Sequence, residues 1–299
     1  MIKLDFDEKD LRSLRVFCSV AQAGGFAAAE KQLLMSKASI SRHVREVEER
    51  LGVQLCERGP AGFRLTPEGE VAVKLASSAL RSLERIRPEI DAVHGVLSGC
   101  LSNGIGEHAI SHADFQLPQA LARLRERAPN VKPEISVMTF PELNQALREN
   151  RVDIALRGKY VEDGEFRYLP LFKETHRVYV STLVGEREGK KLPLVFRMHP
   201  YVQQAIDKWG YERGPAAGGL EAIGVLIATG HYQGLLPTHF GNLLAKRYPL
   251  RLQADSPAFS HPICAVTNPA HPFTHRAELF LKILEELHEG FAESSGDTQ

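Results

Sequence analysis

The chain of 299 residues is long enough for two or three domains, and its 43% hydrophobic and 25% charged residues are typical of soluble globular proteins. Lys and Arg together number 37, as do Asp and Glu, so the formal net charge at pH 7 is zero. This balance excludes a uniformly basic nucleic-acid coat protein, although it leaves room for a local basic patch.

The sequence has no marks of export or membrane insertion. Acidic residues interrupt the first ten positions and no apolar stretch follows them, so we expect no secretory signal. No run approaches the roughly 18 consecutive apolar residues of a membrane span. Four widely spaced cysteines form no CxxC pair and indicate reduced thiols in a cytoplasmic protein: Cys18, Cys56, Cys100 and Cys264.

Two helices are predicted near the start of the chain. Asp10 is a suitable N-cap for the first helix and Gly24-Gly25 ends it, while apolar residues recur at helical spacing at Leu11, Leu14, Phe17 and Ala21. The second helix is shorter and has small residues that permit a close helix crossing. Its apolar face is formed by Phe26, Ala29 and Leu33.

A third helix is predicted after a short connection. Ser36 is a suitable N-cap and Gly52 a suitable terminator, and the apolar residues fall at steps of four, three and four at Ile40, Val44, Val47 and Leu51. Between Lys37 and Arg45 the helix carries three positive charges and no acid. The major groove of a duplex accepts such a helix end, because Arg and Lys bond guanine edges and Ser reaches phosphate or base.

On charge alone, an ordinary solvated helix face explains this surface equally well, but the tight helix-turn-helix spacing around Met35-Ser36 favours DNA. The candidate DNA-binding residues here are Ser36, Lys37, Ala38, Ser39, Ser41, Arg42, His43 and Arg45. Two short strands around a tight turn follow. Their geometry suits a wing that lies along a phosphate backbone, flanked by Arg58 and Arg64.

A long helix is predicted over residues 67–97, with Thr66 as N-cap and Pro67 in its first turn. Its apolar residues form a heptad seam of Ala76, Ala79, Leu83, Ile86, Ile90, Val93 and Leu97. We expect this seam to pair with the same helix of a second copy; packing on the chain's own C-terminal domain is the alternative. Pro88 should kink the helix.

About the first 70 residues resemble the LysR-type transcriptional regulators. The matching segments include Leu14–Phe17, Gly25–Ala29, Ser36–Val44, Leu55–Arg58 and Leu65–Gly69. The chain departs from the family pattern at Lys37-Ala38, where Gln-Pro is usual, at Cys56, usually Phe, and at Glu68, usually Ala. The resemblance implies that Lys37, Ala38, Ser41 and Arg42 face the groove and that Arg58 holds phosphate. The charge at Lys37 leaves the target sequence open.

From Cys100 onward, short β-type runs alternate with helical ones, which is typical of an α/β domain. We expect strands at 101–104, 133–138, 152–156, 177–181, 192–196, 234–236 and 262–266. Helices are expected near 115–127, 141–149, 201–208, 219–229, 239–246 and 274–289. Two lobes with a cleft between them fit this order, and the resemblance implies a periplasmic-binding-protein-like effector domain.

The expected architecture therefore has three parts. An all-α winged helix-turn-helix takes residues 1–66, a linker and dimerisation helix takes 67–97, and a two-lobed α/β effector-binding domain takes 98–299. Lobe I is expected to contain about 98–172 and 267–293, and lobe II about 173–266.

Ligands of open α/β sheets bind at the carboxyl ends of strands, near helix N-termini. Loops at such positions contain the candidate effector-binding residues Glu107, His108, Thr139, Phe140, Arg157, Arg197, Gly218 and Gly219. Arg157, Lys159 and Arg197 predict a positive cleft and an anionic small molecule, although solvated strand ends explain them equally well. His108 and His112 are four residues apart, but no third ligand is evident, so no metal site is predicted.

These features predict a cytoplasmic, sequence-specific DNA-binding transcriptional regulator controlled by a small-molecule effector. Two DNA-binding units paired through the long helix should hold half-sites about one helical turn apart, or a multiple of it. A dimer or tetramer and a contact with RNA polymerase are expected. No GxSxG, HExxH or Cys–His constellation is visible, so neither catalytic residues nor a cofactor are predicted. A solute-binding protein or an enzyme on the same two-lobed scaffold is the alternative.

Overall fold

The computed structural model describes residues 6–59, 62–160, 164–183 and 192–289. The chain divides into two compact units, Met1–Val93 and His94–Gln299, which are described separately below. None of the described helices combines the length and the apolar composition that a bilayer span requires.

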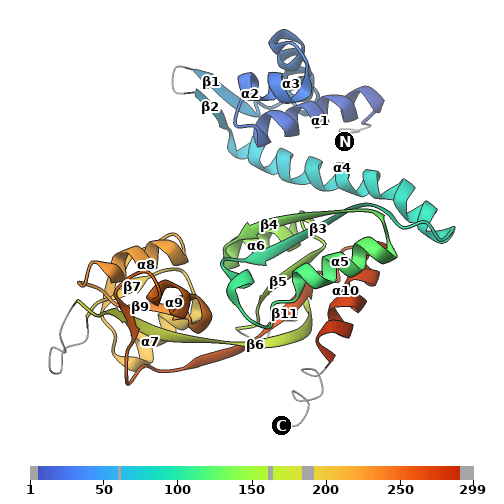
Figure 1. Ribbon diagram of the computed structural model, residues 1–299. Helices are drawn as coiled ribbons and strands as arrows, with labels where there is room; N and C mark the ends of the chain where they lie inside the picture. Colours follow the sequence, from blue (N-terminus) through green and yellow to red (C-terminus); the bar gives the residue numbers. More distant parts are fainter. Residues whose placement is uncertain (1–5, 60–61, 161–163, 184–191, 290–299) are drawn as a thin grey trace. The chain divides into compact units, whose positions relative to one another are not determined.

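The N-terminal unit is a helical core with a two-stranded wing (Figure 1). Its elements are α1 (Glu8–Gln22), α2 (Phe26–Leu33), α3 (Lys37–Leu51), the antiparallel pair β1 (Cys56–Gly59) and β2 (Gly62–Leu65), and α4 (Pro67–Val93). Side chains from the first three helices and from the segment before β1 are fully buried together, among them Phe17, Val20, Ile40, Val44 and Leu55. The amphipathic spacing of each helix therefore directs its apolar face into one shared core.

The caps of these helices agree with the sequence analysis except at the first. Asp7, not Asp10, is the N-cap of α1: the two carboxylates accept reciprocally from each other's backbone N–H, so Asp10 forms the other half of a capping box. Ser36 Oγ accepts from the Ser39 amide at 3.2 Å, and Thr66 Oγ1 accepts from the Gly69 amide at 3.0 Å, which confirms both predicted caps. Gly52 follows α3 in the left-handed conformation, with a φ of 71°.

Helix α4 is continuous through Pro88 and ends at Val93, four residues before the predicted end. Ala76 and Leu80 are buried in the N-terminal core. Farther along, the predicted seam is exposed, with 42–74% of each residue accessible at Leu83, Ile86, Ile90 and Val93. Within the described residues, the second half of α4 therefore presents an apolar stripe.

The C-terminal unit is built on a seven-stranded sheet of order β10-β6-β11-β5-β3-β4, with β9 also paired to β6. Strand β3 is parallel to β4 and β5, whereas β11 is antiparallel to β5 and β6. The strands are β3 (Ser98–Gly106), β4 (Asn130–Met138), β5 (Ile154–Gly158), β6 (Arg167–Ser181), β9 (Gly234–Pro237), β10 (Leu250–Leu252) and β11 (Phe259–Thr267). A separate parallel pair joins β7 (Leu194–Phe196) to β8 (Arg213–Ala216).

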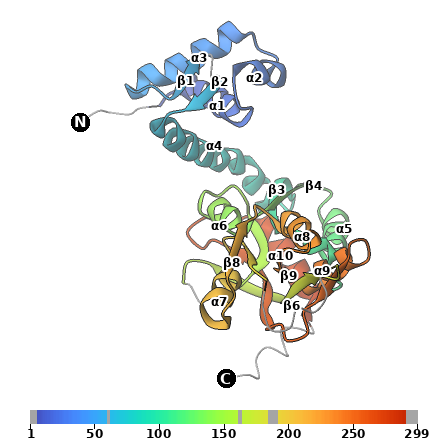
Figure 2. The ribbon, with the colours of Figure 1, turned by 90° about the vertical axis from the view of Figure 1, so that its left-hand side faces the viewer.

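Two lobes share this sheet, and the long strands β6 and β11 run through both (Figures 1 and 2). The first lobe contains α5 (Leu117–Arg127), α6 (Phe140–Arg148) and α10 (His275–Leu287), and η1 (Ala109–Ser111) follows β3. The second contains α7 (Pro200–Trp209), α8 (Leu220–Ala228) and α9 (Thr238–Ala245). Because β11 already pairs with β5 over residues 263–266, the chain is back in the first lobe before the predicted residue 267.

Candidate functional site

The start of α3 projects polar and cationic side chains from the N-terminal unit. Ser36, Lys37, Ala38, Arg42 and Arg45 are exposed, while Ser39 and Ser41 are half-buried. The Lys37 amide donates to the Glu30 carboxylate of α2 at 3.1 Å, which ties the first turn of α3 to the preceding helix. The side chain of Arg42 is 68% exposed and its guanidinium lies 3.9 Å from Glu46, too far for a hydrogen bond, so it can reorient towards a ligand.

His43 is a correction to the predicted DNA-binding set. It is only 5% exposed and belongs to the buried face of α3, because its position falls between the core residues Ile40 and Val44. Its Nδ1 lies 2.9 Å from the Ser13 hydroxyl of α1, which in turn donates to Glu46 at 2.9 Å. The imidazole therefore joins α1 to α3 and is not available to a duplex.

The wing carries a second exposed cation. Arg64 on β2 is 81% exposed and lies 3.5 Å from Glu57 on β1, a solvated pair that a phosphate can displace. Arg58 lies on β1, but its side chain is outside the described part of the structure. Phe63 packs edge-on against Phe26 at 5.9 Å and so attaches the wing to α2.

In the C-terminal unit, side chains after β3 contact the second lobe across a cleft. Glu107 lies 3.5 Å from Arg197, and both side chains are largely buried. His108 stacks on Phe240 of α9 with ring centroids 3.7 Å apart and pairs with Glu221 of α8 at 3.1 Å. These contacts hold the two lobes together in the described conformation.

The predicted positive charge of the cleft is largely neutralised or covered. Arg197 is paired with Glu107, and Arg157 is 4% exposed. The Arg157 guanidinium donates to the Gly158 carbonyl and to the Tyr168 hydroxyl, and lies 5.0 Å from the centroid of the Phe140 ring. The structure thus brings the two arginines to one cleft, where Arg197 faces a carboxylate and Arg157 is buried against neutral acceptors and an aromatic ring.

Two hollows meet near Phe140, Arg197 and His199, which line both of them. The outer one is an open groove of about 730 Å³ between the first turns of α6 and the segment 196–200. The inner one is a narrow cavity of about 60 Å³ that also contacts Glu107 and Arg157. The groove is large enough for a small organic molecule, whereas the cavity holds about two waters.

Four predicted effector residues line neither hollow. Thr139 caps α6, and its amide and hydroxyl donate to Glu142 at 2.8 Å each. The His108 ring stacks on Phe240 and contacts Glu221 instead. Gly218 is exposed, and Gly219 is close to the cleft because an added Cβ would lie 2.6 Å from Glu107 Oε1.

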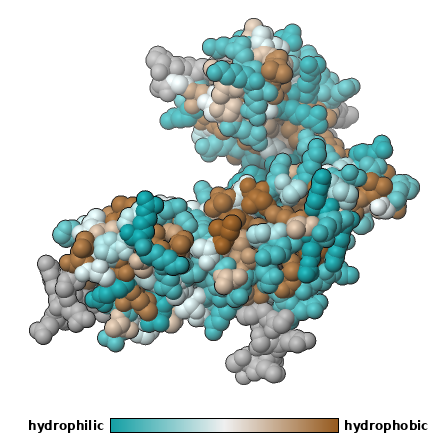
Figure 3. All heavy atoms as spheres, viewed as in Figure 1, coloured by the Kyte–Doolittle hydropathy of each residue, from teal (hydrophilic) through white to brown (hydrophobic). Residues whose placement is uncertain are grey.

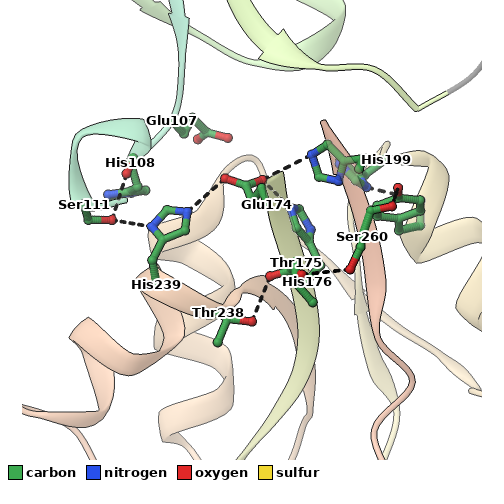
Figure 4. Close-up of polar contacts among 12 residues, drawn as sticks. Glu107, His108, Ser111, Glu174, Thr175, His176, His199, Thr238, His239 and Ser260 are labelled. Atoms are coloured by element: carbon green, nitrogen blue, oxygen red, sulfur yellow. Dashed lines mark hydrogen bonds and ion pairs between the residues drawn. The ribbon is translucent and has the colours of Figure 1, made fainter. Parts of the chain in front are cut away.

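Sequence reasoning missed a histidine cluster around Glu174, here defined as that carboxylate with His176, His199, His239 and His261. Figure 4 shows Glu174 with His176, His199 and His239. Glu174 Oε2 lies 2.7 Å from His176 Nε2, and Glu174 Oε1 lies 2.9 Å from His239 Nε2. The Glu-x-His spacing on one face of a strand was the available signal, but the partners on β11, at the N-cap of α7 and on α9 are far away in sequence.

The environment sets the ionisation of this histidine cluster. Burial raises the pKa of Glu174, but hydrogen bonds from His176 and His239 outweigh it and hold the pKa well below the usual value. Burial lowers the pKa of His176 and, more strongly, that of His199. At neutral pH the carboxylate is therefore ionised and these two imidazoles are neutral.

A helix-turn-helix with a wing, followed by a two-lobed α/β unit with a cleft, defines a ligand-responsive DNA-binding regulator. Residues 11–70 match the family described as "Bacterial regulatory helix-turn-helix protein, lysR family", and residues 109–289 match the "LysR substrate binding domain". The chain belongs to the LysR family of transcriptional regulators.

Named relatives are similar over different lengths. The HTH-type transcriptional activator BauR of Pseudomonas aeruginosa is 29% identical over 244 residues, which cover 77% of this chain and 79% of BauR. CrgA of Neisseria meningitidis is 33% identical over 168 residues, 56% of this chain and 54% of CrgA. In fold, the chain resembles CbnR, a LysR family transcriptional regulator, with a TM-score of 0.62, 20% identity and coverage of 93% of this chain and 99% of CbnR.

Proposed function

We propose that this regulator reads its DNA target through the start of α3 and grips the backbone with its wing. The exposed set Lys37, Ala38, Arg42 and Arg45 is our candidate for base and nearby phosphate contacts, and Arg64 for a phosphate contact. We place the DNA-binding domain at 1–66, the linker region at 67–97, of which α4 forms Pro67–Val93, and the effector-binding domain at 98–299. The observation that carries this proposal is the rigid attachment of an exposed cationic helix start to a buried core.

Self-association through α4 completes the proposed DNA-binding assembly. The exposed stripe of Leu83, Ile86, Ile90 and Val93 continues at heptad spacing over three helical turns, as a pairing helix does. A second copy would cover it and would set two copies of α3 at the spacing of a pair of half-sites. We propose a dimer or tetramer acting in the cytoplasm with RNA polymerase.

The groove between α6 and the segment 196–200 is our candidate effector site. An anionic effector would have to compete with Glu107 for Arg197, because that carboxylate already pairs with the guanidinium. Such competition would break a contact between the lobes and couple binding to their relative position. A coupling of about 1–3 kcal/mol is enough for a useful transcriptional response.

Genome-wide capture of DNA bound by the protein tests this function most broadly. We expect discrete sites that share a motif with two half-sites, and neighbouring genes would also indicate the effector. Uniform recovery of the genome would contradict a sequence-specific regulator. A solute-binding protein or an enzyme on this scaffold would recover no DNA, and a turnover screen would then separate those two.

A further inference from the structure

Glu174 and His261 are direct cross-strand partners of β6 and β11, and His176 lies two residues along β6 on the same face. Glu174 Oε2 is 2.7 Å from His176 Nε2 and 3.4 Å from His261 Nε2, and each of the three residues offers a ligand atom within 4.8 Å of those of the other two. We propose that Glu174, His176 and His261 bind a divalent transition-metal ion of the class of Zn²⁺, Co²⁺ or Ni²⁺. Tetrahedral zinc with bonds of about 2.0 Å separates its ligand atoms by about 3.3 Å, so small side-chain shifts accommodate the ion.

The hydrogen bonding of the histidine cluster is incomplete where a metal would bind. His261 is 3% exposed; its Nε2 lies 3.4 Å from Glu174 without forming a hydrogen bond, and its Nδ1 has no hydrogen-bond partner among the described residues. Nε2 of His199 is likewise buried without a partner there, while its Nδ1 accepts from the Tyr201 amide. Buried polar atoms without partners are rare because they cost stability, and a bound ion would satisfy His261 directly.

His239 acts as a positioning residue for the carboxylate. Its Nδ1 lies 2.7 Å from the Ser111 hydroxyl, and its Nε2 lies 2.9 Å from Glu174 Oε1. Both contacts can be followed in Figure 4. These two contacts fix Oε1 of Glu174, while its Oε2 faces His176 and His261. Outer hydrogen bonds of this kind orient the ligands of protein metal sites.

The donor set of these three side chains suits a transition-metal ion. Two imidazole nitrogens and one carboxylate oxygen favour the zinc class over Mg²⁺ or Ca²⁺, which prefer oxygen ligands.

Space at the site also fits an ion. The adjoining cavity of about 60 Å³ contacts Glu174 and His176 and is too small for an aromatic effector. Gly158 also lines the cavity, and a Cβ there would lie 2.6 Å from His261 Nε2 and 2.5 Å from the Tyr160 ring, so His261 packs directly against a residue of the cavity wall. An ion with one water as the fourth ligand would occupy this room.

Titration of untagged, chelator-stripped full-length protein with Co²⁺ tests the proposal without reference to DNA. We expect one Co²⁺ per chain, visible absorption bands typical of four- or five-coordinate Co²⁺, and displacement by one equivalent of Zn²⁺. Absence of these bands, or lack of one-to-one binding by the folded parent protein, would overturn the site whatever the variants do.

Variants then assign the ligands. His176→Gln and His261→Gln should each weaken Co²⁺ binding at least 100-fold, and Ser111→Ala by about 10- to 100-fold through the loosened His239. His288→Gln is the matched control, since His288 is buried in the same unit but bonds the Leu284 and Asp114 carbonyls instead. Parental binding in folded His176→Gln and His261→Gln proteins, checked by circular dichroism, would contradict the assignment.

Discussion

The Ser13 hydroxyl of α1 lies 2.9 Å from Nδ1 of His43 on α3 and donates to Glu46 at 2.9 Å. Since a hydroxyl has one proton and gives it to the carboxylate, it accepts from the imidazole N–H. This buried link fixes α3, and therefore its exposed cationic start, against α1.

Ser13→Ala should reduce the stability of the N-terminal unit by about 1–3 kcal/mol at pH 7, because His43 and Glu46 lose a buried partner. The effect should shrink in acid. The hydrogen bond from Ser13 is the main cause of the lowered pKa of Glu46 in the folded protein. This hydrogen bond therefore stabilises the fold fully above the usual carboxyl pKa, and the stabilisation is lost as the pH falls through the lowered pKa of the folded state.

Hydrogen exchange of α1 and α3 amides in the full chain, at pH 7 and pH 4, measures this difference. Ser19→Ala is the matched control on α1, since the Ser19 hydroxyl bonds an exposed carbonyl of its own helix. Its effect should stay within about 0.5 kcal/mol. An equal loss in both variants, or a Ser13→Ala loss that is independent of pH, would contradict the role given to Ser13.

Gly69→Ala should destabilise the N-terminal unit by about 1–3 kcal/mol or more, through a clash with the backbone. A Cβ at Gly69 would lie 1.9 Å from the Leu55 carbonyl oxygen. Because this oxygen belongs to the backbone, a change of side-chain rotamer cannot relieve the clash. Gly218→Ala is the comparison, because nothing lies within 4 Å of the added carbon. In thermal unfolding, the N-terminal unit of Gly69→Ala should melt at a clearly lower temperature than that of Gly218→Ala. Equal transition temperatures would contradict the prediction and show that α4 can shift away from Leu55.

Arg64→Ala should weaken binding to all duplexes by a similar factor and should lower the slope of log affinity against log salt by about one. The physical reason is the loss of one phosphate contact from the wing. Fluorescence anisotropy across a salt series measures the slope, with Arg167→Ala in the C-terminal unit as the charge-matched control. An unchanged slope in Arg64→Ala would remove Arg64 from the phosphate contacts.

Ile86→Asp combined with Ile90→Asp should convert the assembly to smaller species, because a charged pair on the α4 stripe cannot be buried in a helix pair. Sedimentation velocity gives the mass directly. Val225→Asp serves as the control, since Val225 is 66% exposed on α8, outside the stripe. A double variant with parental mass would show that α4 does not mediate self-association.

Local signals in the sequence predicted most of the architecture. The Ser36 and Thr66 caps and the apolar faces of the helices depend on residues within one or two turns, so their spacing is visible without the fold. The strand β8, the strand β10 and the first half of β6 were missed, because they are short or lack a clear apolar alternation.

Side chains that meet through tertiary packing were predicted poorly. His43 lies in a cationic stretch of sequence, yet its helical position turns it towards Ser13, thirty residues earlier. Glu174 and His261 become neighbours only through the register of β6 with β11. The exposure of Lys37 and Arg42 depends only on the helix period and the position of the core face, which is why it could be predicted from the sequence.

Selection from a random duplex library tests the central claim, that the start of α3 reads DNA sequence. The parent protein should enrich one motif with two half-sites, and Arg42→Ala should lose preference at a single position of each half-site, at a cost of about 1–3 kcal/mol. Failure of the parent to enrich any motif, or an identical motif from Arg42→Ala, would contradict this account.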